Sequence, residues 1–407
     1  MRLIIPLISI IFTQLSFSQN PIWQVKSIDS SIEDYSDLKF LDSLLKDKRI
    51  VALGEQTHYD GATFDAKVRL IKYLHKELGF NVIAFESGVY DCYKADQLIK
   101  HRENTDSTNY LNQAIFGVWD NAQVHKLANY IDKEVSEDTP LNMCGFDIQF
   151  AGNFAKESLK KDLIKYTKLL QNKLNIDLEI NENKLDSSLY TLARLSNYFS
   201  KIPPSDTLVL FNTTNSISSA IMRIAEPKSE DIFWKKILEL IQIDYRKRYL
   251  KKSQRDSVMA NNLIWLMDEF YPKEKIIVWS ANTHISKSTK SLQSKYFQEN
   301  KMMGEYLKKY YDNSYYTLGF TSYGGRFFDR WFINTLVTSK PKKKSIESFL
   351  KNKEYDYCFI HFPEDYIQTN DEYLNNSKVF GNKPRKMKVN KAFDGLFFIN
   401  QMYPANY

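Results

Sequence analysis

Four short apolar runs stand out along the chain, and each of them ends at a polar or ionisable residue. They occupy residues 49–53, 82–85, 141–146 and 276–279. Hydrophobicity that is continuous rather than alternating indicates strands that are covered on both faces, as in a parallel sheet. We therefore predict an α/β fold with a mostly parallel sheet flanked by helices.

The segment between the first two runs has the spacing of an amphipathic helix. Apolar residues recur at three- and four-residue steps over residues 62–78, and Gly79 stands where a helix would end. A strand, a helix and a second strand therefore follow one another at the start of the fold.

Helical periodicity also dominates a long region, from about residue 155 to residue 268, with lysines on the opposite faces. We interpret this region as a helical insertion between two strands, forming a wall or lid over the C-terminal ends of the strands. Polar residues at 205–206 and 226–230 predict loops within it. Because strand-like runs return afterwards, at 315–320 and 357–362, we expect one α/β domain, residues 19–407, rather than several independent domains.

The N-terminus has the layout of a secretory signal. Met1 and Arg2 are followed by an apolar stretch of about fifteen residues and then by Ser18 and Gln19. The stretch is shorter than the roughly 20 residues of a transmembrane helix, and no cysteine lies near the cleavage point. We therefore predict a signal peptide at residues 1–18, export to the periplasm or the medium, and no stable membrane anchor.

The charges argue against a nucleic-acid partner. The chain has 56 Lys and Arg against 49 Asp and Glu, and the excess is spread thinly along it. The longest cationic stretch, at 340–344, has no aromatic or glycine-rich neighbours and is typical of a solvated loop. The 3 cysteines are too few to make disulfides the basis of the fold. The sequence carries no sign of an oligomeric state.

The residues that could carry chemistry follow the predicted strands. In open α/β sheets ligands bind beyond the carboxyl ends of the strands, so polar side chains from distant parts of the sequence meet there. The six that we expect at this edge are Glu55, His58, Glu86, Asp147, Asn282 and His284.

Glu55 and His58 have a spacing that suits general acid–base catalysis. If the chain turns helically after Gly54, a three-residue step places both side chains on one face. A histidine is the natural general base near pH 7, and a neighbouring carboxylate can hold its tautomer. The pattern is not the H-E-x-x-H of zincins, and no G-x-S-x-G elbow of a serine hydrolase occurs in the chain.

Several stretches in a fixed order carry a resemblance to a known family. They are residues 50–58, 67–74, 79–86, 118–119, 145–147, 255–256 with 259–260, 278–284 and 303–307. Together they resemble the erythromycin esterase family, from about residue 49 to residue 320. The resemblance implies an α/β hydrolytic fold with helical elaboration and a link to antibiotic resistance.

The resemblance also implies a mechanism. A histidine that matches His58 activates water to open a macrolactone ester without a covalent intermediate, and no cofactor is needed. Residues matching Glu55, Glu86 and His284 line that catalytic site. We expect Lys67, Trp119, Asp147 and Asn282 to contact the substrate, a small-molecule ester or lactone.

At three positions the chain departs from the pattern of macrolide-hydrolysing members. Ala281 replaces a histidine three residues before His284, Lys67 replaces an arginine nine residues after the base, and Gln123 replaces an acid that follows the tryptophan. Lysine lacks the planar fork of arginine, so donor geometry changes at that position. The water-activating pair is intact, whereas hydrolysis of macrolides themselves does not follow from these residues.

Two other hypotheses fit the same residues. Two glutamates and two histidines form a plausible ligand set for zinc or manganese, and the G-E-x-x-H pattern also looks like that of the wider Tiki/TraB group, some of which use metals. Alternatively, the protein is an exported binding protein that keeps the pocket and, with Ala281, has lost turnover. We rank the metal-independent hydrolase first and binding without turnover last.

Overall fold

The computed structural model describes residues 21–101, 108–193, 204–250, 255–329, 334–363 and 372–407. The predicted signal peptide at residues 1–18 lies outside the described residues. Among the helices of the described part, none is long and apolar enough to cross a membrane.

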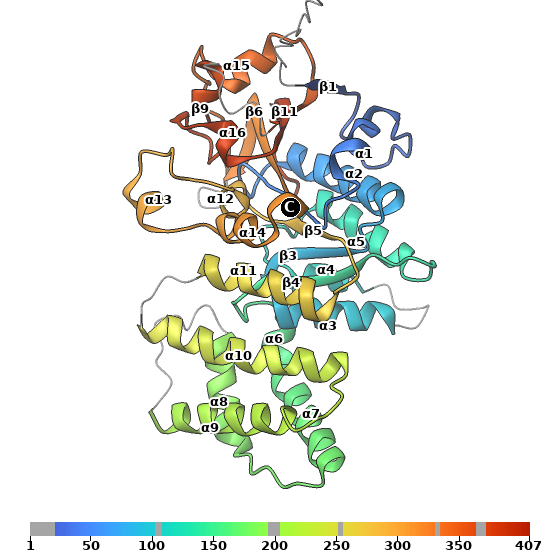
Figure 1. The fold of residues 1–407 in the computed structure, drawn as a ribbon, viewed down its shortest axis with the longest axis vertical. Coiled ribbons are helices and arrows are strands. Elements are labelled where there is room, and N and C mark those ends of the chain that lie inside the picture. The colour runs from blue at the N-terminus through green and yellow to red at the C-terminus, as the bar shows by residue number, and fades with distance from the viewer. Residues whose placement is uncertain (1–20, 102–107, 194–203, 251–254, 330–333, 364–371) are drawn as a thin grey trace, which may run out of the picture.

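The strands form one large sheet and one small one (Figure 1). The nine-stranded sheet has the order β1-β8-β11-β6-β2-β5-β3-β4, with β7 beside β6, and the second sheet pairs β10 with β9. The strands are β1 (Ile22–Val25), β2 (Ile50–Leu53), β3 (Val82–Gly88), β4 (Asn142–Asp147), β5 (Ile276–Trp279), β6 (Tyr315–Asp329), β7 (Asn334–Val337), β8 (Tyr357–His361), β9 (Asn376–Ser377), β10 (Arg385–Lys386) and β11 (Gly395–Met402).

The sheet is mostly parallel, as predicted. All neighbours from β11 through β6, β2, β5 and β3 to β4 pair in parallel, while β8, β1 and β7 pair antiparallel at the margins. Every residue of β2, β3 and β5 is buried, so both faces of the central sheet are covered. This is the physical reason for the continuous apolar runs in the sequence.

Helices precede, connect and follow many of these strands. They are α1 (Phe40–Leu45), α2 (Gly61–Leu78), α3 (Val89–Lys100), α4 (Tyr110–Ala114), α5 (Ala122–Glu134), α6 (Asn153–Glu157), α7 (Leu159–Leu174), α8 (Glu182–Ala193), α9 (Pro204–Ile221), α10 (Ser229–Leu250), α11 (Arg255–Trp265), α12 (Asn282–Ile285), α13 (Lys295–Glu299), α14 (Met303–Tyr311), α15 (Ile346–Lys351) and α16 (Val389–Ala392).

Helix α2 begins and ends close to where the sequence predicts. Asp60 caps its first turn by accepting from the backbone N–H and the hydroxyl of Thr63, at 3.2 and 2.6 Å. Gly79 ends it in the left-handed region, with φ of 69°, a conformation that glycine adopts without a steric penalty. Two local sequence signals therefore fix the helix that follows the Glu55–His58 loop.

The region between β4 and β5 is helical, as predicted, and consists of α6 to α11. In Figure 1 helices α7 to α10 form a bundle beyond α3 and α6, while α11 lies against the sheet. The predicted loop at 205–206 is wrong, because both residues lie in the first turn of α9. Pro204 opens this turn and Asp206 lies within it, and both residue types favour the N-terminal turn of a helix.

Candidate active site

The order of the strands brings the predicted site residues together. In the sequence β5 follows β2, β3 and β4, but in the sheet it lies between β2 and β3, so the strand order switches there. The carboxyl ends of β2, β5, β3 and β4 consequently lie side by side, and such a switch point is the usual ligand site of an open α/β sheet. Polar residues follow or end each of these four strands.

Glu55 is the centre of the first group of contacts. Its Oε1 accepts from the indole N–H of Trp119 at 2.8 Å and lies 2.6 Å from Nδ1 of His58. Its Oε2 accepts from the ammonium of Lys67 at 2.8 Å. Burial alone would raise the pKa of Glu55, but the charges of Lys67 and His58 outweigh it and hold this pKa below its ordinary value. The carboxylate is therefore ionised and held on three sides.

His58 projects from the loop after β2 into a more open environment. Glu55 fixes its Nδ1, and the ring lies perpendicular to that of Trp119 with 5.5 Å between centroids. Its side chain is 38% exposed. Burial lowers the pKa of His58, whereas the hydrogen bond and charge of Glu55 raise it, and the net direction is upward. This arrangement makes His58 a stronger base and leaves Nε2 to act.

Lys67 and Trp119 both donate hydrogen bonds to Glu55 and are buried. The Lys67 side chain is fully buried, and its nitrogen lies 3.8 Å from the centre of the Trp279 ring. Burial lowers the pKa of Lys67 to about 8, even though Glu55 raises it. Trp119 is 1% exposed. Both side chains are buried and bond to Glu55, so these placements do not support the prediction that Lys67 and Trp119 contact the substrate.

Asn282 also has its polar atoms occupied. Its amide nitrogen donates to the carbonyls of Phe320 and Val379, both at 2.7 Å, and its oxygen accepts from the N–H of Phe320 at 3.0 Å. Its own backbone N–H donates to the carbonyl of Glu55 at 3.0 Å. Asn282 therefore joins the loop after β5 to neighbouring segments, and its burial does not support the prediction of a substrate contact.

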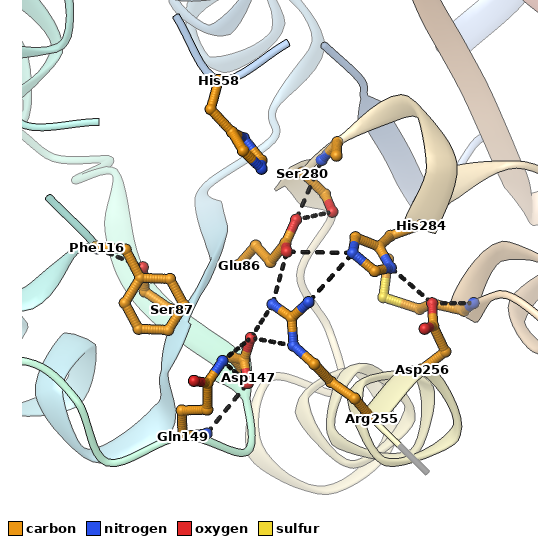
Figure 2. A network of polar contacts seen from close by, with 12 residues as sticks. His58, Glu86, Ser87, Phe116, Asp147, Gln149, Arg255, Asp256, Ser280 and His284 are labelled. Carbon is orange, nitrogen blue, oxygen red and sulfur yellow. Dashed lines mark hydrogen bonds and ion pairs between the residues drawn. The ribbon is translucent and has the colours of Figure 1, made fainter. Parts of the chain in front are cut away.

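A second group of charges surrounds Glu86, near the end of β3 (Figure 2). Arg255 donates to Glu86 at 2.7 Å and, through Nε, to Asp147 at 2.9 Å, so it bridges the ends of β3 and β4. The other Glu86 oxygen accepts from the Ser280 hydroxyl at 2.6 Å and from the Ala281 N–H at 3.1 Å. Burial would raise the pKa of Glu86, but its cationic neighbours hold it well below the ordinary value.

The pairing of β3 with β4 is irregular at Glu86. The register between β3 and β4 shifts between Phe85 and Gly88, and such irregularities re-aim a side chain at the end of a strand. The strands approach closely there, since a Cβ on Gly145 would lie 2.4 Å from the carbonyl oxygen of Gly88. Glycine is therefore required at residue 145 for Asp147 and Glu86 to lie side by side.

His284 completes the second group. Its Nδ1 lies 2.7 Å from Asp256, and its Nε2 lies 3.4 Å from Glu86. Burial lowers the pKa of His284, but the carboxylates of Glu86 and Asp256 raise it, and the net direction is upward. In Figure 2 the His58 ring points toward the side of this group where Glu86 and Ser280 lie. All four predicted catalytic residues thus lie around one edge of the sheet.

Arg255 and Asp256 are site residues to which the sequence analysis assigned no role. They begin α11, at the end of the helical insertion, and this helix forms one wall of the site. No strand precedes these residues, so the search along strand ends did not find them. The available signal was the motif at 255–256, one of the stretches that carry the family resemblance. Ser280 was also missed, although it stands directly after the apolar run of β5.

Two cavities open at the site. The first, about 360 Å³, is lined by Glu55, Gln56, Thr57, His58, Ala281, Thr283, Phe297, Phe380, Gly381 and Arg385. The second, about 440 Å³, is lined by Arg255, Asp256, Ser257, Tyr296, Glu299, Asn300, Lys301 and Tyr306. Both volumes suit a small molecule. His58 lines the first cavity and the start of α11 lines the second.

The segment at residues 403–407 contacts the loop that follows β2. The hydroxyl of Tyr407 donates to the backbone carbonyls of His58 at 3.2 Å and Val118 at 2.7 Å. The N–H of Ala405 donates to the carbonyl of Tyr59 at 3.1 Å. This segment therefore links the loop of His58 to the loop that carries Trp119.

The proposed metal ligands do not form a metal site in the described part of the chain. There, no group of three His, Cys, Asp or Glu side chains is arranged to hold a metal ion. Lys67 and Arg255 are bonded to Glu55 and Glu86, the two carboxylates that the metal-dependent alternative needs. Cations already neutralise these donors, so the residues do not fit that alternative.

Comparison with known proteins identifies the family. A family model for erythromycin esterase matches residues 75–402. The protein YbfO of Bacillus subtilis (strain 168), whose name describes a hydrolase, is 29% identical over 405 residues, which cover 93% of this chain and 89% of YbfO. Erythromycin esterase type II of Escherichia coli is 22% identical over 410 residues, which cover 91% of this chain and 93% of the esterase.

Solved structures share the fold. The crystal structure of a succinoglycan biosynthesis protein matches with a TM-score of 0.75 at 18% identity, covering 95% of both chains. A mutant of the erythromycin esterase EreC in its open conformation matches with a TM-score of 0.69 at 14% identity, covering 95% of this chain and 99% of EreC. With the family model matching most of its length, the chain belongs to the erythromycin esterase family of hydrolases.

Proposed function

We propose that this protein hydrolyses a carboxylic ester or lactone of a small molecule, with His58 as the general base. The observation that supports it most is the 2.6 Å contact between Nδ1 of His58 and Glu55, on the wall of a cavity of about 360 Å³. A histidine fixed at one nitrogen by a carboxylate holds the other nitrogen ready to accept a proton. The family and the name of its Escherichia coli relative point to the same chemistry.

The reaction follows from these groups. His58 Nε2 takes a proton from water as the water oxygen adds to the acyl carbon, so no covalent enzyme intermediate forms. Arg255, with His284 beside it, stabilises the negative charge that develops on the acyl oxygen. The tetrahedral intermediate then breaks its bond to the leaving oxygen, and protonated His58 returns the proton to that oxygen. Glu55 stabilises the imidazolium between the two steps.

The remaining side chains position these groups. Lys67 and Trp119 keep Glu55 ionised and oriented toward His58. Arg255 holds the carboxylates of Glu86 and Asp147 side by side, and the Ser280 hydroxyl fixes the second oxygen of Glu86. Because lysine and arginine supply the positive charge, the proposed reaction uses no metal or other cofactor.

Turnover of a substrate panel tests the proposal. The panel contains 4-nitrophenyl esters, aliphatic lactones and one macrolide, assayed with wild type, His58→Asn and His101→Asn. His101 is an exposed histidine outside the site and controls for the loss of an imidazole. We expect His58→Asn to lose about 100-fold or more in kcat, with His101→Asn unchanged. Equal rates in wild type and His58→Asn would refute the assignment.

The same panel separates the alternatives. A compound that raises the melting temperature while mass spectrometry finds no product would favour the binding protein without turnover. Loss of activity after dialysis against a chelator, with recovery on adding Zn²⁺ or Mn²⁺, would favour the metal-dependent hydrolase. Turnover of the macrolide would support a link to antibiotic resistance despite Ala281 and Lys67.

We also propose that the protein is exported after removal of residues 1–18. The apolar N-terminal stretch and the small residue before Gln19 support this proposal. Fractionation of expressing cells, followed by N-terminal sequencing, tests it. Mature protein in the periplasm or medium that begins at Gln19 is the expected result, and full-length protein in the cytoplasm would contradict it.

A further inference from the structure

Arg385 adds a positive charge to the cavity that contains His58. The cavity is lined by one acidic side chain, Glu55, and one arginine, Arg385. The carboxylate of Glu55 is already held by Lys67, His58 and Trp119. Arg385 is exposed, and among the described residues no side chain or carbonyl bonds to its guanidinium. A cation of this kind, without a protein partner, is available to a ligand.

The sequence around Arg385 is free of acidic residues. Between Glu372 and Asp394 all six charged residues are cations, namely Lys378, Lys383, Arg385, Lys386, Lys388 and Lys391. Lys383, Arg385, Lys386 and Lys388 are exposed, and within the described part of the chain none of these four forms an ion pair. The segment that supplies Arg385 to the cavity therefore has a positive field that attracts anions.

Buried amides fix this segment to the catalytic loop. Gln56, which follows Glu55, donates to the carbonyl of Gly381 at 3.3 Å and to the side chain of Asn382 at 2.9 Å. Its oxygen accepts from the N–H of Ser322 at 3.0 Å. Asn282 donates to the carbonyl of Val379 at 2.7 Å. The backbone that carries Arg385 is thus held in a defined position relative to His58.

Aromatic rings form part of the lining of the same cavity. Phe380 lines the cavity, packs against Phe393 with 5.6 Å between centroids, and faces Phe297 at 6.2 Å. Such a wall accepts a flat or apolar body. The cavity therefore offers a base at one position, an apolar wall, and a guanidinium at the rim.

We infer that the substrate is an ester or lactone whose apolar body carries an anionic group, and that Arg385 binds this group. The inference rests on the proposed hydrolysis and specifies its substrate class. The planar fork of arginine matches a carboxylate, which accepts two parallel hydrogen bonds from it. The volume of about 360 Å³ restricts the occupant to a small molecule or to one end of a larger one.

Two 4-nitrophenyl esters with the same acyl chain, one anionic and one neutral, test the inference. Mono-4-nitrophenyl glutarate ends in a carboxylate, and its methyl ester is neutral. We expect wild type to favour the anionic ester in kcat/KM, and Arg385→Met to lose about 10-fold on this ester and about 2-fold at most on the neutral one. Equal losses on both esters would overturn the inference.

Lys386→Met is the matched control. Lys386 is the next residue of β10, is exposed, and does not line the cavity, because successive side chains of a strand point to opposite faces. The substitution Lys386→Met removes one positive charge from the same strand, as Arg385→Met does. We expect both esters to change by about 2-fold at most. A loss of the anion preference equal to that of Arg385→Met would mean that the general field selects the substrate, which would overturn a binding role for Arg385.

A binding measurement distinguishes failure of this inference from failure of the proposed reaction. The 4-nitroanilide of glutaric acid and its methyl ester replace the ester bond by an amide, and calorimetry gives their Kd values. If no ester is turned over, but wild type binds the anionic anilide about 10-fold more tightly and Arg385→Met loses this difference, Arg385 binds anions and the hydrolysis proposal fails. If Arg385→Met keeps the difference, the inference about Arg385 fails.

Discussion

Replacing Glu55 by glutamine removes the charge around which the site is built while keeping the size of the side chain. Lys67 is the partner most affected, because its side chain is fully buried and its ammonium donates to Glu55. In wild type, burial lowers the pKa of Lys67 to about 8, and the charge of Glu55 opposes that effect. Without this charge the pKa of Lys67 falls further, so the amine loses its proton near neutral pH.

The loss of the Lys67 proton sets how far Glu55→Gln lowers the free energy of unfolding. Neutralising an amine with the ordinary pKa of 10.5 at pH 7 costs about 5 kcal/mol. This figure agrees with the cost of about 3–5 kcal/mol for breaking a buried ion pair by removing one partner. Lys67 has a lowered pKa in the folded state, so the unfolded chain binds more protons and stability rises with pH. Between pH 7 and 8 the destabilisation should therefore shrink, by about 1.4 kcal/mol per pH unit at most.

Urea unfolding of Glu55→Gln at pH 7 and pH 8 measures both effects. The double variant Glu55→Gln with Lys67→Met removes the buried amine as well, so it should regain much of the lost stability and show little change over this pH range. Glu77→Gln is a surface control, because the pair of Glu77 with Lys39 is exposed and its loss should leave the free energy of unfolding nearly unchanged.

Activity gives a second measure of the same substitution. Glu55 orients His58 and raises its pKa, so Glu55→Gln should lower kcat by about 100-fold or more and shift the acidic limb of the rate profile to lower pH. An NMR titration of His58 reports this pKa directly. A single variant as stable as wild type, or a double variant less stable than the single, would refute the reasoning, as would an unchanged pKa of His58.

Three further outcomes are expected. The kcat/KM of wild type should fall as the pH is lowered through a pKa above 6.5, because His58 must be neutral to accept a proton and its pKa is raised; a rate independent of pH between 5 and 8 would contradict this. Arg255→Met should lower the free energy of unfolding in urea by about 3 kcal/mol, since it leaves the buried carboxylates of Glu86 and Asp147 without their shared cation; a loss below about 1 kcal/mol would show that they need no such partner. Tyr407→Phe should reduce kcat by about 2- to 5-fold with KM unchanged, because its hydroxyl no longer donates to the carbonyl of His58; full activity would mean that this segment does not position the loop.

Local patterns predicted much of the fold. The runs at 49–53, 82–85, 141–146 and 276–279 correspond to β2, β3, β4 and β5, and the helix at 62–78 is α2. These elements are set by interactions within a few residues or by burial on both faces, which leave a continuous apolar signal. The loop predicted at residues 205–206 lies instead at the start of the helix at residues 204–221, whose many serine, threonine and asparagine residues also favour loops.

The sequence by itself determined which residues could do acid–base chemistry and that they follow strands of a parallel sheet, since strand ends and side-chain types are local properties. Only the tertiary structure decided their roles. The position of β5 between β2 and β3 brings Glu86 and His284 together. Helix α11 adds Arg255, which the strand pattern of the sequence does not predict. Lys67 is buried and pairs with Glu55, because a buried ammonium requires a partner that only the folded chain supplies.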